Sequence, residues 1–230
     1  LIEQNGHYWV TETNKETART HRIDPDFLNL LWKQFDVETV TREGLVVEYN
    51  EEELEKKSSF PIPQLPKLEG SGGVTIDMRI SLQDLGAGQF IFDTRDEEGR
   101  GMLAETGAYG SIKLTLSNGK MSSSWCSDRG LIEAFGTHQI TAVVHSGPRI
   151  ISFVVNGIVC DGREYRPFGW GKYHKDITNI NGGSLRTGNQ KKGSKKLKHL
   201  RIYNRNLMHT EAIGNHRAFE GSRPQLLLKD

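Results

Sequence analysis

Apolar and polar residues alternate along much of the chain between residues 74 and 205. Residues 74–80 and 112–116 place an apolar side chain at every second position. Successive side chains of a strand point to opposite faces, so this spacing predicts half-buried strands. Residues 140–144 and 150–155 are apolar at almost every position, which is typical of strands covered on both faces.

Turn residues separate these runs at short intervals. Asn118-Gly119 and Asn156-Gly157 each stand between two strand patterns, and Asn-Gly is the preferred pair for a tight hairpin because both positions need positive φ. A last strand pattern at 197–203 precedes a short helix expected near 210–218. Many short strands with regular turns predict an all-β fold, a two-sheet antiparallel jelly-roll sandwich with a short C-terminal helix.

The pattern divides the chain into three segments. Residues 1–50 form a partly helical N-terminal appendage or the tail of an upstream domain, with a helix predicted near residues 24–32, where Asp24 caps and Pro25 takes the first position. Residues 51–73 combine charged residues, three prolines and several glycines, which predicts an extended linker. Residues 74–230 then hold the sandwich.

Composition excludes several classes of protein. The formal net charge of +1 argues against a nucleic-acid binder, whose domain is normally clearly basic. No run approaches the ~18 apolar residues of a membrane span, so we expect no membrane insertion. The chain starts at Leu1 without a signal peptide, and we expect it to be a piece of a longer protein. Cys126 and Cys160 form either one disulfide or two separate thiols.

Two motifs indicate a family. His138–Val144 followed by a strand that ends at Asn156-Gly157, and Leu200–Leu207 followed by Thr210–Ile213, resemble the central hairpin and the closing strand and helix of laminin-G-like domains. The resemblance to this concanavalin A-like lectin/glucanase group covers residues about 73–220. It implies two curved antiparallel sheets with ligands on the concave face or the edge loops. It does not imply catalysis, because the fold serves lectins, carbohydrate-binding modules, adhesion domains and some glycosidases.

Catalytic and metal-binding patterns are sparse. The laminarinase-like branch of this fold carries Glu-x-Asp-x-Glu within a strand, and the sequence contains no such motif. Its nearest approach, residues 93–99, reads as a hydrophilic turn bounded by glycine. Asp93, Asp96 and Glu98 are the alternative there, as a candidate calcium site. Apart from that possible calcium, we expect no cofactor and no catalytic residues.

The candidate ligand-binding residues lie in and after a glycine-rich loop at 168–174. Trp170 has glycine on both sides, and with Tyr173 it is predicted to form a two-ring platform for a sugar face. Arg186 and Asn189 are expected to supply hydrogen bonds to hydroxyl groups. The alternative is that Trp170 closes one end of the sandwich as a core residue.

These features together predict a non-catalytic carbohydrate-binding or carbohydrate-associated module of a larger secreted glycan-processing protein. Its partner would be a polysaccharide or oligosaccharide, and its location extracytoplasmic: periplasmic, cell-surface or secreted. We expect covalent linkage to other domains of the parent chain. Two alternatives stay open: a glycoside hydrolase or other glycan-active enzyme with carboxylates from separate strands, and a structural or adhesion β-sandwich.

Overall fold

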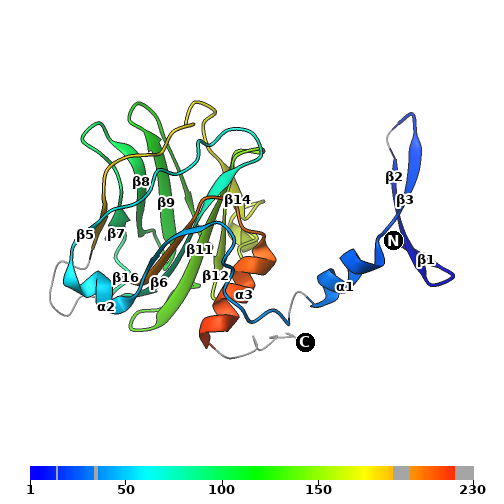
Figure 1. Cartoon of the computed structure of the whole chain (residues 1–230), viewed down its shortest axis with the longest axis horizontal. Coiled ribbons are helices and arrows are strands. Elements are labelled where there is room, and N and C mark those ends of the chain that lie inside the picture. The colour runs from blue at the N-terminus through cyan, green and yellow to red at the C-terminus, as the bar shows by residue number, and fades with distance from the viewer. Residues whose placement is uncertain (14, 34–35, 189–196, 221–230) are drawn as a thin grey trace.

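Two antiparallel sheets face each other and form a β-sandwich (Figure 1). The computed structural model describes residues 1–13, 15–33, 36–188 and 197–220. The six-stranded sheet contains, in spatial order, β10 (Ser122–Cys126), β9 (Ile112–Asn118), β8 (Arg100–Thr106), β7 (Phe90–Asp93), β15 (Leu185–Thr187) and β5 (Ser59–Phe60). The seven-stranded sheet contains β13 (Ile158–Val159), β12 (Ile150–Val155), β11 (Thr137–His145), β6 (Gly73–Ser81), β16 (Leu197–Tyr203) and β4 (Leu45–Tyr49), with β14 (Trp170–Lys172) also paired to β12. The predicted jelly-roll sandwich is confirmed.

The two Asn-Gly pairs make different turns. Asn156 and Gly157 both have positive φ, 50° and 74°, and Val155 pairs directly with Ile158, so this is the predicted two-residue hairpin. At the other pair only Gly119 has positive φ, and Ser117 pairs with Ser122 across a longer loop.

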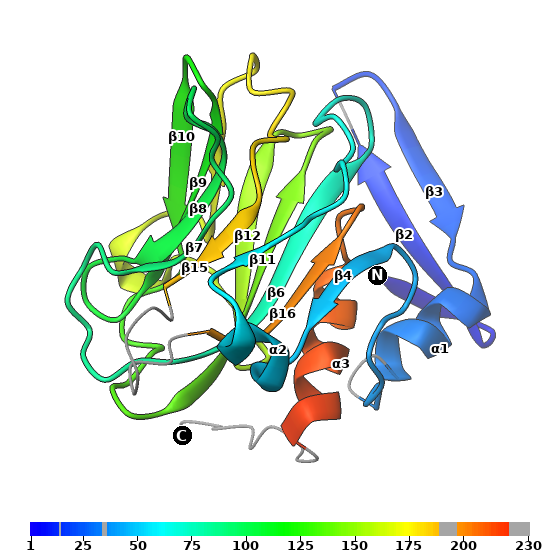
Figure 2. The same cartoon turned by 60° about the vertical axis from the view of Figure 1, so that its left-hand side comes forward.

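Helix α3 (His209–Glu220) covers the outer face of the seven-stranded sheet (Figure 2). Beneath it, the buried carboxylate of Asp77 on β6 accepts hydrogen bonds from Gln139 at 2.7 Å, Thr141 at 3.0 Å and Asn215 at 3.0 Å. Arg201 forms an ion pair with the same carboxylate at 3.4 Å. We call these five residues the α3 cluster. It explains why Asp77 is as buried as the apolar residues beside it on β6.

The predicted linker at 51–73 is instead built into the sandwich. Asn50 caps helix α2 (Glu51–Lys56) by a capping box with Glu53, and β5 joins the six-stranded sheet. Prolines exclude helix from the rest, but they permit an extended chain whose side chains reach the core. The segment buries four apolar residues: Leu54, Phe60, Leu65 and Leu68. Since β4 also pairs with β16, the sandwich starts well before the predicted boundary at residue 74.

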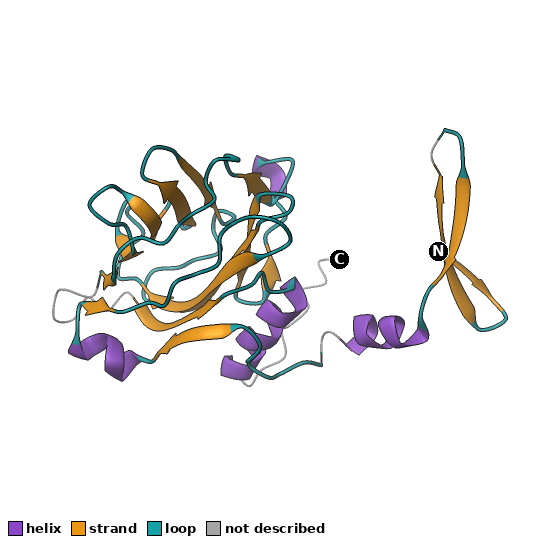
Figure 3. Cartoon of the chain, turned by 45° about the horizontal axis from the view of Figure 1, so that its top comes forward, coloured by secondary structure: helices purple, strands orange, loops and turns teal. Residues whose placement is uncertain are grey.

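The first 33 residues form a small unit that stands away from the sandwich (Figures 1 and 3). A three-stranded sheet of β1 (Ile2–Gln4), β2 (His7–Thr13) and β3 (Ala18–Arg22) precedes helix α1 (Pro25–Lys33). The helix is confirmed, but its apolar face is mostly exposed: Phe27 is 59% exposed and Trp32 57%, while Leu28 is buried. Within the described ranges, no helix is long and apolar enough to cross a membrane.

Candidate functional site

A pocket lies at the corner of the sandwich where the edges of the two sheets meet. β10 is the edge strand of one sheet, and β13 and β14 lie at the edge of the other. The pocket has a volume of about 260 Å³, and we call it the β10 pocket. Its lining comprises Ala108, Ser111, Ser124, Trp125, Cys126, Ser127, Asp128, Arg129, Gly162, Tyr165 and Arg166.

Asp128 is the buried residue that links the segments lining the pocket. Its side chain is 2% exposed, and its carboxylate accepts hydrogen bonds from the backbone N–H groups of Asp161 at 3.0 Å and Gly162 at 3.2 Å. Gly162 has φ 94°, and a Cβ there would lie 2.6 Å from the carbonyl oxygen of Arg166, so the loop requires glycine. Asp128 therefore fixes the loop after β13 against the end of β10.

Arg166 forms the back wall of the pocket. One of its terminal nitrogens donates to Asp128 at 2.7 Å and the other donates to the carbonyl of Cys126 at 3.0 Å. Its Cζ lies 4.5 Å from the ring centroid of Trp125, within the range of a cation–π contact. Three interactions thus hold one guanidinium, whose side chain is still 23% exposed.

Trp125 fills the space behind Arg166. A Cβ on Gly171 of β14 would lie 2.0 Å from the Trp125 ring, so the indole packs directly against glycine backbone. Its Nε1–H donates to the carbonyl of Gly169 at 3.2 Å. Trp125 faces inward and packs against the main core. Gly171 accommodates the Trp125 ring, and Gly169 accommodates the backbone of Cys160, where a Cβ would lie 1.8 Å from the carbonyl oxygen. Neither glycine serves to loosen the chain around Trp170.

Arg129 lies at the mouth of the pocket between two loops. Its Cζ is 4.6 Å from the ring centroid of Tyr109 and 5.0 Å from that of Tyr165, which belongs to the 3₁₀ helix η1 (Arg163–Tyr165). Both rings are largely exposed, Tyr109 by 72% and Tyr165 by 61%. Gly130 donates its backbone N–H to the Tyr109 carbonyl at 2.9 Å, which keeps the two loops together. The mouth of the pocket therefore presents a guanidinium and two phenol rings to solvent.

A second, wider hollow adjoins the first. It has a volume of about 640 Å³ and shares Arg129 and Tyr165 with the β10 pocket. Its lining comprises Arg129, Gly130, Ile158, Val159, Asp161, Arg163, Glu164 and Tyr165. The two hollows lie on either side of the Arg129–Tyr165 contact.

Both cysteines near this corner are free thiols. Cys160 accepts a hydrogen bond at its Sγ from the backbone N–H of Asp128 at 3.3 Å. Burial raises the pKa of the Cys160 thiol to about 11 and also raises that of Cys126. Neither thiol is activated as a nucleophile, since activation requires a lowered pKa.

The ligand residues predicted from the sequence are not brought together. Trp170 is 37% exposed and stacks on Phe168 at 4.9 Å, but Tyr173 is only 4% exposed and belongs to the core. The predicted two-ring platform of Trp170 with Tyr173 is therefore wrong, because the Tyr173 side chain is buried in the core between the sheets. Gly171 faces inward on Trp125, so its neighbour Trp170 points to the opposite face, away from the β10 pocket.

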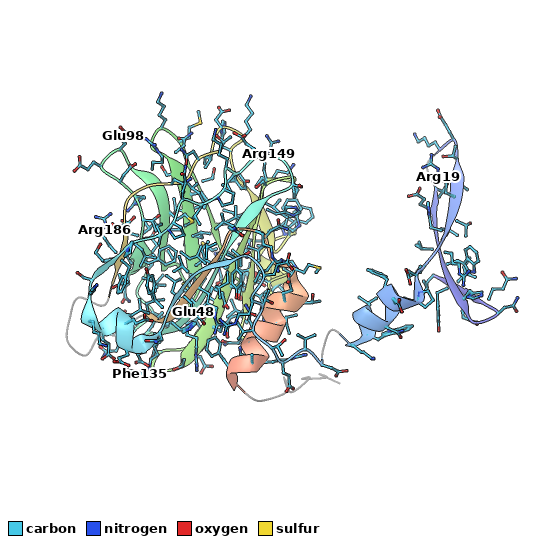
Figure 4. The ribbon with its side chains drawn as sticks, viewed as in Figure 1. Arg19, Glu48, Glu98, Phe135, Arg149 and Arg186 are labelled. Atoms are coloured by element: carbon cyan, nitrogen blue, oxygen red, sulfur yellow. The ribbon has the colours of Figure 1, made fainter. Side chains whose placement is uncertain are left out.

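Arg186 lies in the other sheet, on β15 beside β7. Figure 4 shows it on the opposite side of the sandwich from Arg149, whose carbonyl accepts the backbone N–H of Tyr173 at 3.0 Å. Arg186 forms an ion pair with Asp93 at 3.1 Å. Asn189, the fourth predicted residue, lies outside the described residues.

The three carboxylates of the candidate calcium site have arginine or backbone partners. Asp93 also pairs with Arg95 at 3.0 Å; burial of Asp93 opposes its ionisation, but the Arg95 contacts prevail and lower its pKa. Asp96 accepts two backbone N–H groups in the turn, and Glu98 pairs with Arg100. In the part of the chain that the structure describes, no group of three metal-ligating side chains is found. The calcium site stays a prediction without support from this geometry.

Comparisons with known proteins extend the description of the fold. No family model matches the sequence, and no curated protein sequence matches it. Among solved structures, the CBM40 module of a Ruminococcus gnavus IT-sialidase bound to α2,3-sialyllactose is similar with a TM-score of 0.48 and 10% identity, over 74% of this chain and 97% of that chain. An SAP-like pentraxin from Limulus polyphemus gives 0.44 and 16%, over 72% and 79%. A leech intramolecular trans-sialidase gives 0.46 and 13%, over 77% and 28%. These likenesses concern the fold alone.

Proposed function

We propose that this chain is a carbohydrate-binding module that holds a saccharide over Tyr165 of the β10 pocket and the ring of Tyr109, which lies on the other side of Arg129's contacts outside the pocket lining. The observation that carries the proposal is the pair of exposed rings, Tyr109 and Tyr165, held in place by Arg129. A sugar presents an apolar C–H face and a rim of hydroxyl groups. An exposed aromatic ring beside polar side chains matches both parts.

The hydrogen-bond donors of Arg166 belong to the same pocket lining as Tyr165. Arg166 uses one hydrogen of each terminal nitrogen on Asp128 and Cys126, and a guanidinium carries five N–H donors in all. Among the described residues, its other donors have no acceptor, so they are available for sugar hydroxyl groups. Because Asp128 fixes Arg166, binding requires little further ordering of this side chain.

The site fits an oligosaccharide better than a single sugar. The β10 pocket and the adjoining hollow share Arg129 and Tyr165, so successive rings of one chain would occupy the two sides of this contact. Such a ligand places the module outside the cytoplasm, linked to a glycan-processing parent protein. Residues 1–33, which stand apart from the sandwich, are the segment we assign to contacts with the rest of that parent.

Binding without catalysis is the favoured version of this function. A glycosidase needs an acid and a second carboxylate facing the scissile bond. The buried carboxylate of the pocket, Asp128, is already held by Arg166 and two backbone N–H groups. We therefore expect no release of reducing sugar from polysaccharides that the chain binds. Sugar release that stops on mutation of one Asp or Glu would instead establish the enzyme.

The test is titration calorimetry against a panel of neutral and acidic oligosaccharides. We expect weak binding, with a dissociation constant on the order of 0.1–1 mM. Tyr109→Ala and Tyr165→Ala should each weaken it about threefold to tenfold, the usual value of one aromatic contact, and the double variant should bind undetectably. Phe135→Ala, at a ring 81% exposed outside the pocket, is the matched control. It should bind the oligosaccharide as tightly as the unmutated chain does.

Two results would overturn the assignment. If the double tyrosine variant binds with the affinity of the unmutated chain, the β10 pocket is not the binding site. Loss of binding in Trp170→Ala alone would move the site to the Phe168–Trp170 stack, whose rings are 53% and 37% exposed.

A further inference from the structure

Arg129 differs from Arg166, the other arginine that lines the β10 pocket, because no described carboxylate pairs with it. Arg166 pairs with buried Asp128 at 2.7 Å. Among the residues that the structure describes, no acidic side chain lies within ion-pair distance of Arg129, and its contacts are the two tyrosine rings. A ring face attracts the cation without neutralising its charge or using its N–H groups in conventional hydrogen bonds.

The local charge balance leaves the pocket positive. Its lining contains one carboxylate, Asp128, and two guanidinium groups, Arg129 and Arg166. The Asp128–Arg166 pair is internally neutral, so the uncompensated charge is that of Arg129. This charge is at the exposed mouth, where an arriving ligand meets it first.

Resting on the proposed saccharide function, we propose that the bound glycan is anionic and that Arg129 receives its carboxylate or sulfate group. The planar fork of a guanidinium matches both oxyanions in a bidentate arrangement. Tyr109 and Tyr165 limit where this fork lies before binding, so less conformational freedom is lost on forming the pair. Carboxylates of uronic sugars and sulfate esters share this chemistry.

The experiment compares ligands that differ only in charge. Trigalacturonate and its methyl ester share one backbone, and lactose and its sulfate monoester share another. We expect the unmutated chain to bind the charged member of at least one pair at least tenfold more tightly, because hydrogen bonds to charged groups are stronger than those between neutral groups. The preference should shrink as sodium chloride is raised, since the pair at the pocket mouth is screened.

Variants then assign the preference to one residue. Arg129→Ala should remove most of the difference between charged and neutral ligands, while Arg129→Lys should keep part of it because the charge remains. Arg149→Ala is the matched control: it removes the same charge from an exposed position outside the pocket lining. Circular dichroism and the thermal midpoint verify that each variant is folded.

The outcomes separate this inference from the proposed function. Equal binding of charged and neutral partners, lost in the double tyrosine variant but unchanged in Arg129→Ala, overturns the anionic ligand and leaves the saccharide site. A charge preference that survives in Arg129→Ala also overturns it. Preference for the galacturonate alone identifies a carboxylate ligand, and preference for the sulfate ester alone identifies a sulfated one. Absence of binding to every ligand at millimolar concentration overturns both proposals.

Discussion

The α3 cluster and the β10 pocket share one arrangement of three groups: an arginine that pairs with a buried carboxylate and lies over an aromatic ring. In the α3 cluster, Arg201 pairs with Asp77 and its Cζ lies 4.3 Å from the Phe219 ring centroid. In the pocket, Arg166 pairs with Asp128 and lies 4.5 Å from Trp125. The side chain of Arg201 is 4% exposed and that of Arg166 is 23% exposed. A helix closes the first arrangement, whereas the second stays open and adds Arg129 in front.

This difference shows how one local motif serves two purposes. In the α3 cluster, two side chains contact one carboxylate oxygen of Asp77 and two contact the other. Together these contacts attach a helix to a sheet. In the pocket, Asp128 organises a loop and leaves donors of Arg166 free among the described residues. The first arrangement should therefore affect stability most, and the second should affect stability and ligand binding together.

Asp77→Ala should give the largest loss of stability. Among the described residues it leaves the buried Arg201 with Glu48, at 2.8 Å, as its one acidic partner, and removing one partner of a buried pair costs about 3–5 kcal/mol. Urea unfolding measures the loss. Asp176→Ala, at a side chain 54% exposed, is the control and should change the free energy of unfolding by less than about 0.5 kcal/mol. A similar small loss in Asp77→Ala would show that the cluster is not needed for stability.

Asp128→Ala should cost less, about 2–4 kcal/mol, because its partner Arg166 is partly hydrated after the change. Unlike Asp77→Ala, it should also abolish saccharide binding, since the loop carrying Tyr165 loses its anchor. Asp176→Ala, at a side chain 54% exposed and outside both hollows, provides the comparison and should keep the ligand affinity. Retention of ligand affinity in Asp128→Ala would mean that the loop keeps its shape without the carboxylate.

Acidification should lower the free energy of unfolding through protonation of His199, which lies on β16 near helix α3. Burial, with the nearby charge of Arg201, lowers the pKa of His199 to about 4, while an unfolded histidine titrates near 6.5. Between these two values the unfolded chain binds more protons, so the free energy of unfolding falls as the pH drops from about 6.5 to about 4, by roughly 1–3 kcal/mol. Denaturant curves across this range measure it.

The histidine variant isolates this contribution from that of the carboxylates. His199→Gln should flatten the pH dependence between 6.5 and 4, whereas His21→Gln, at a side chain 54% exposed, should leave it unchanged. An equally steep fall in His199→Gln would assign the effect to other groups.

Trp170→Ala should have the smallest effect. The ring is partly exposed and its stack on Phe168 contributes about 1 kcal/mol, so the thermal midpoint should move by only a few degrees. Saccharide affinity should stay within twofold of the parent value if the β10 pocket is the site.

The sequence predicted the parts of the fold that repeat with a fixed period. The strand at 74–80 and the hairpin at Asn156-Gly157 follow from alternation and turn chemistry alone. The burial of Leu65 was missed because prolines identify extended chain, but they do not show whether that chain lies in solvent or on a core. Here Asn181 exchanges two hydrogen bonds with the backbone of Leu65, at 2.6 and 2.9 Å, and residues so far apart in sequence give no local signal.

The site was harder to predict for the same reason. Tyr109, Arg129 and Tyr165 lie in three separate loops, and no periodicity applies to loops. The only local hint was the concentration of arginine and tyrosine at residues 163–166. Trp170 stood out because of its flanking glycines, yet Gly171 is required by contact with the Trp125 ring and Gly169 by contact with the backbone of Cys160. No sequence pattern shows either contact.

The position of the pocket at a corner of the sandwich has a consequence for the evolution of specificity. Tyr109, Arg129 and Tyr165 lie in connections between strands, outside the hydrogen-bonded ladders. Under the proposed function, substitutions at these three positions should alter which ligand binds while the sheets keep their register and their core. A combinatorial library confined to them should yield mostly folded proteins with changed ligand preference. The scaffold can in this way be retargeted at a small number of positions, as the loops of an antibody domain are.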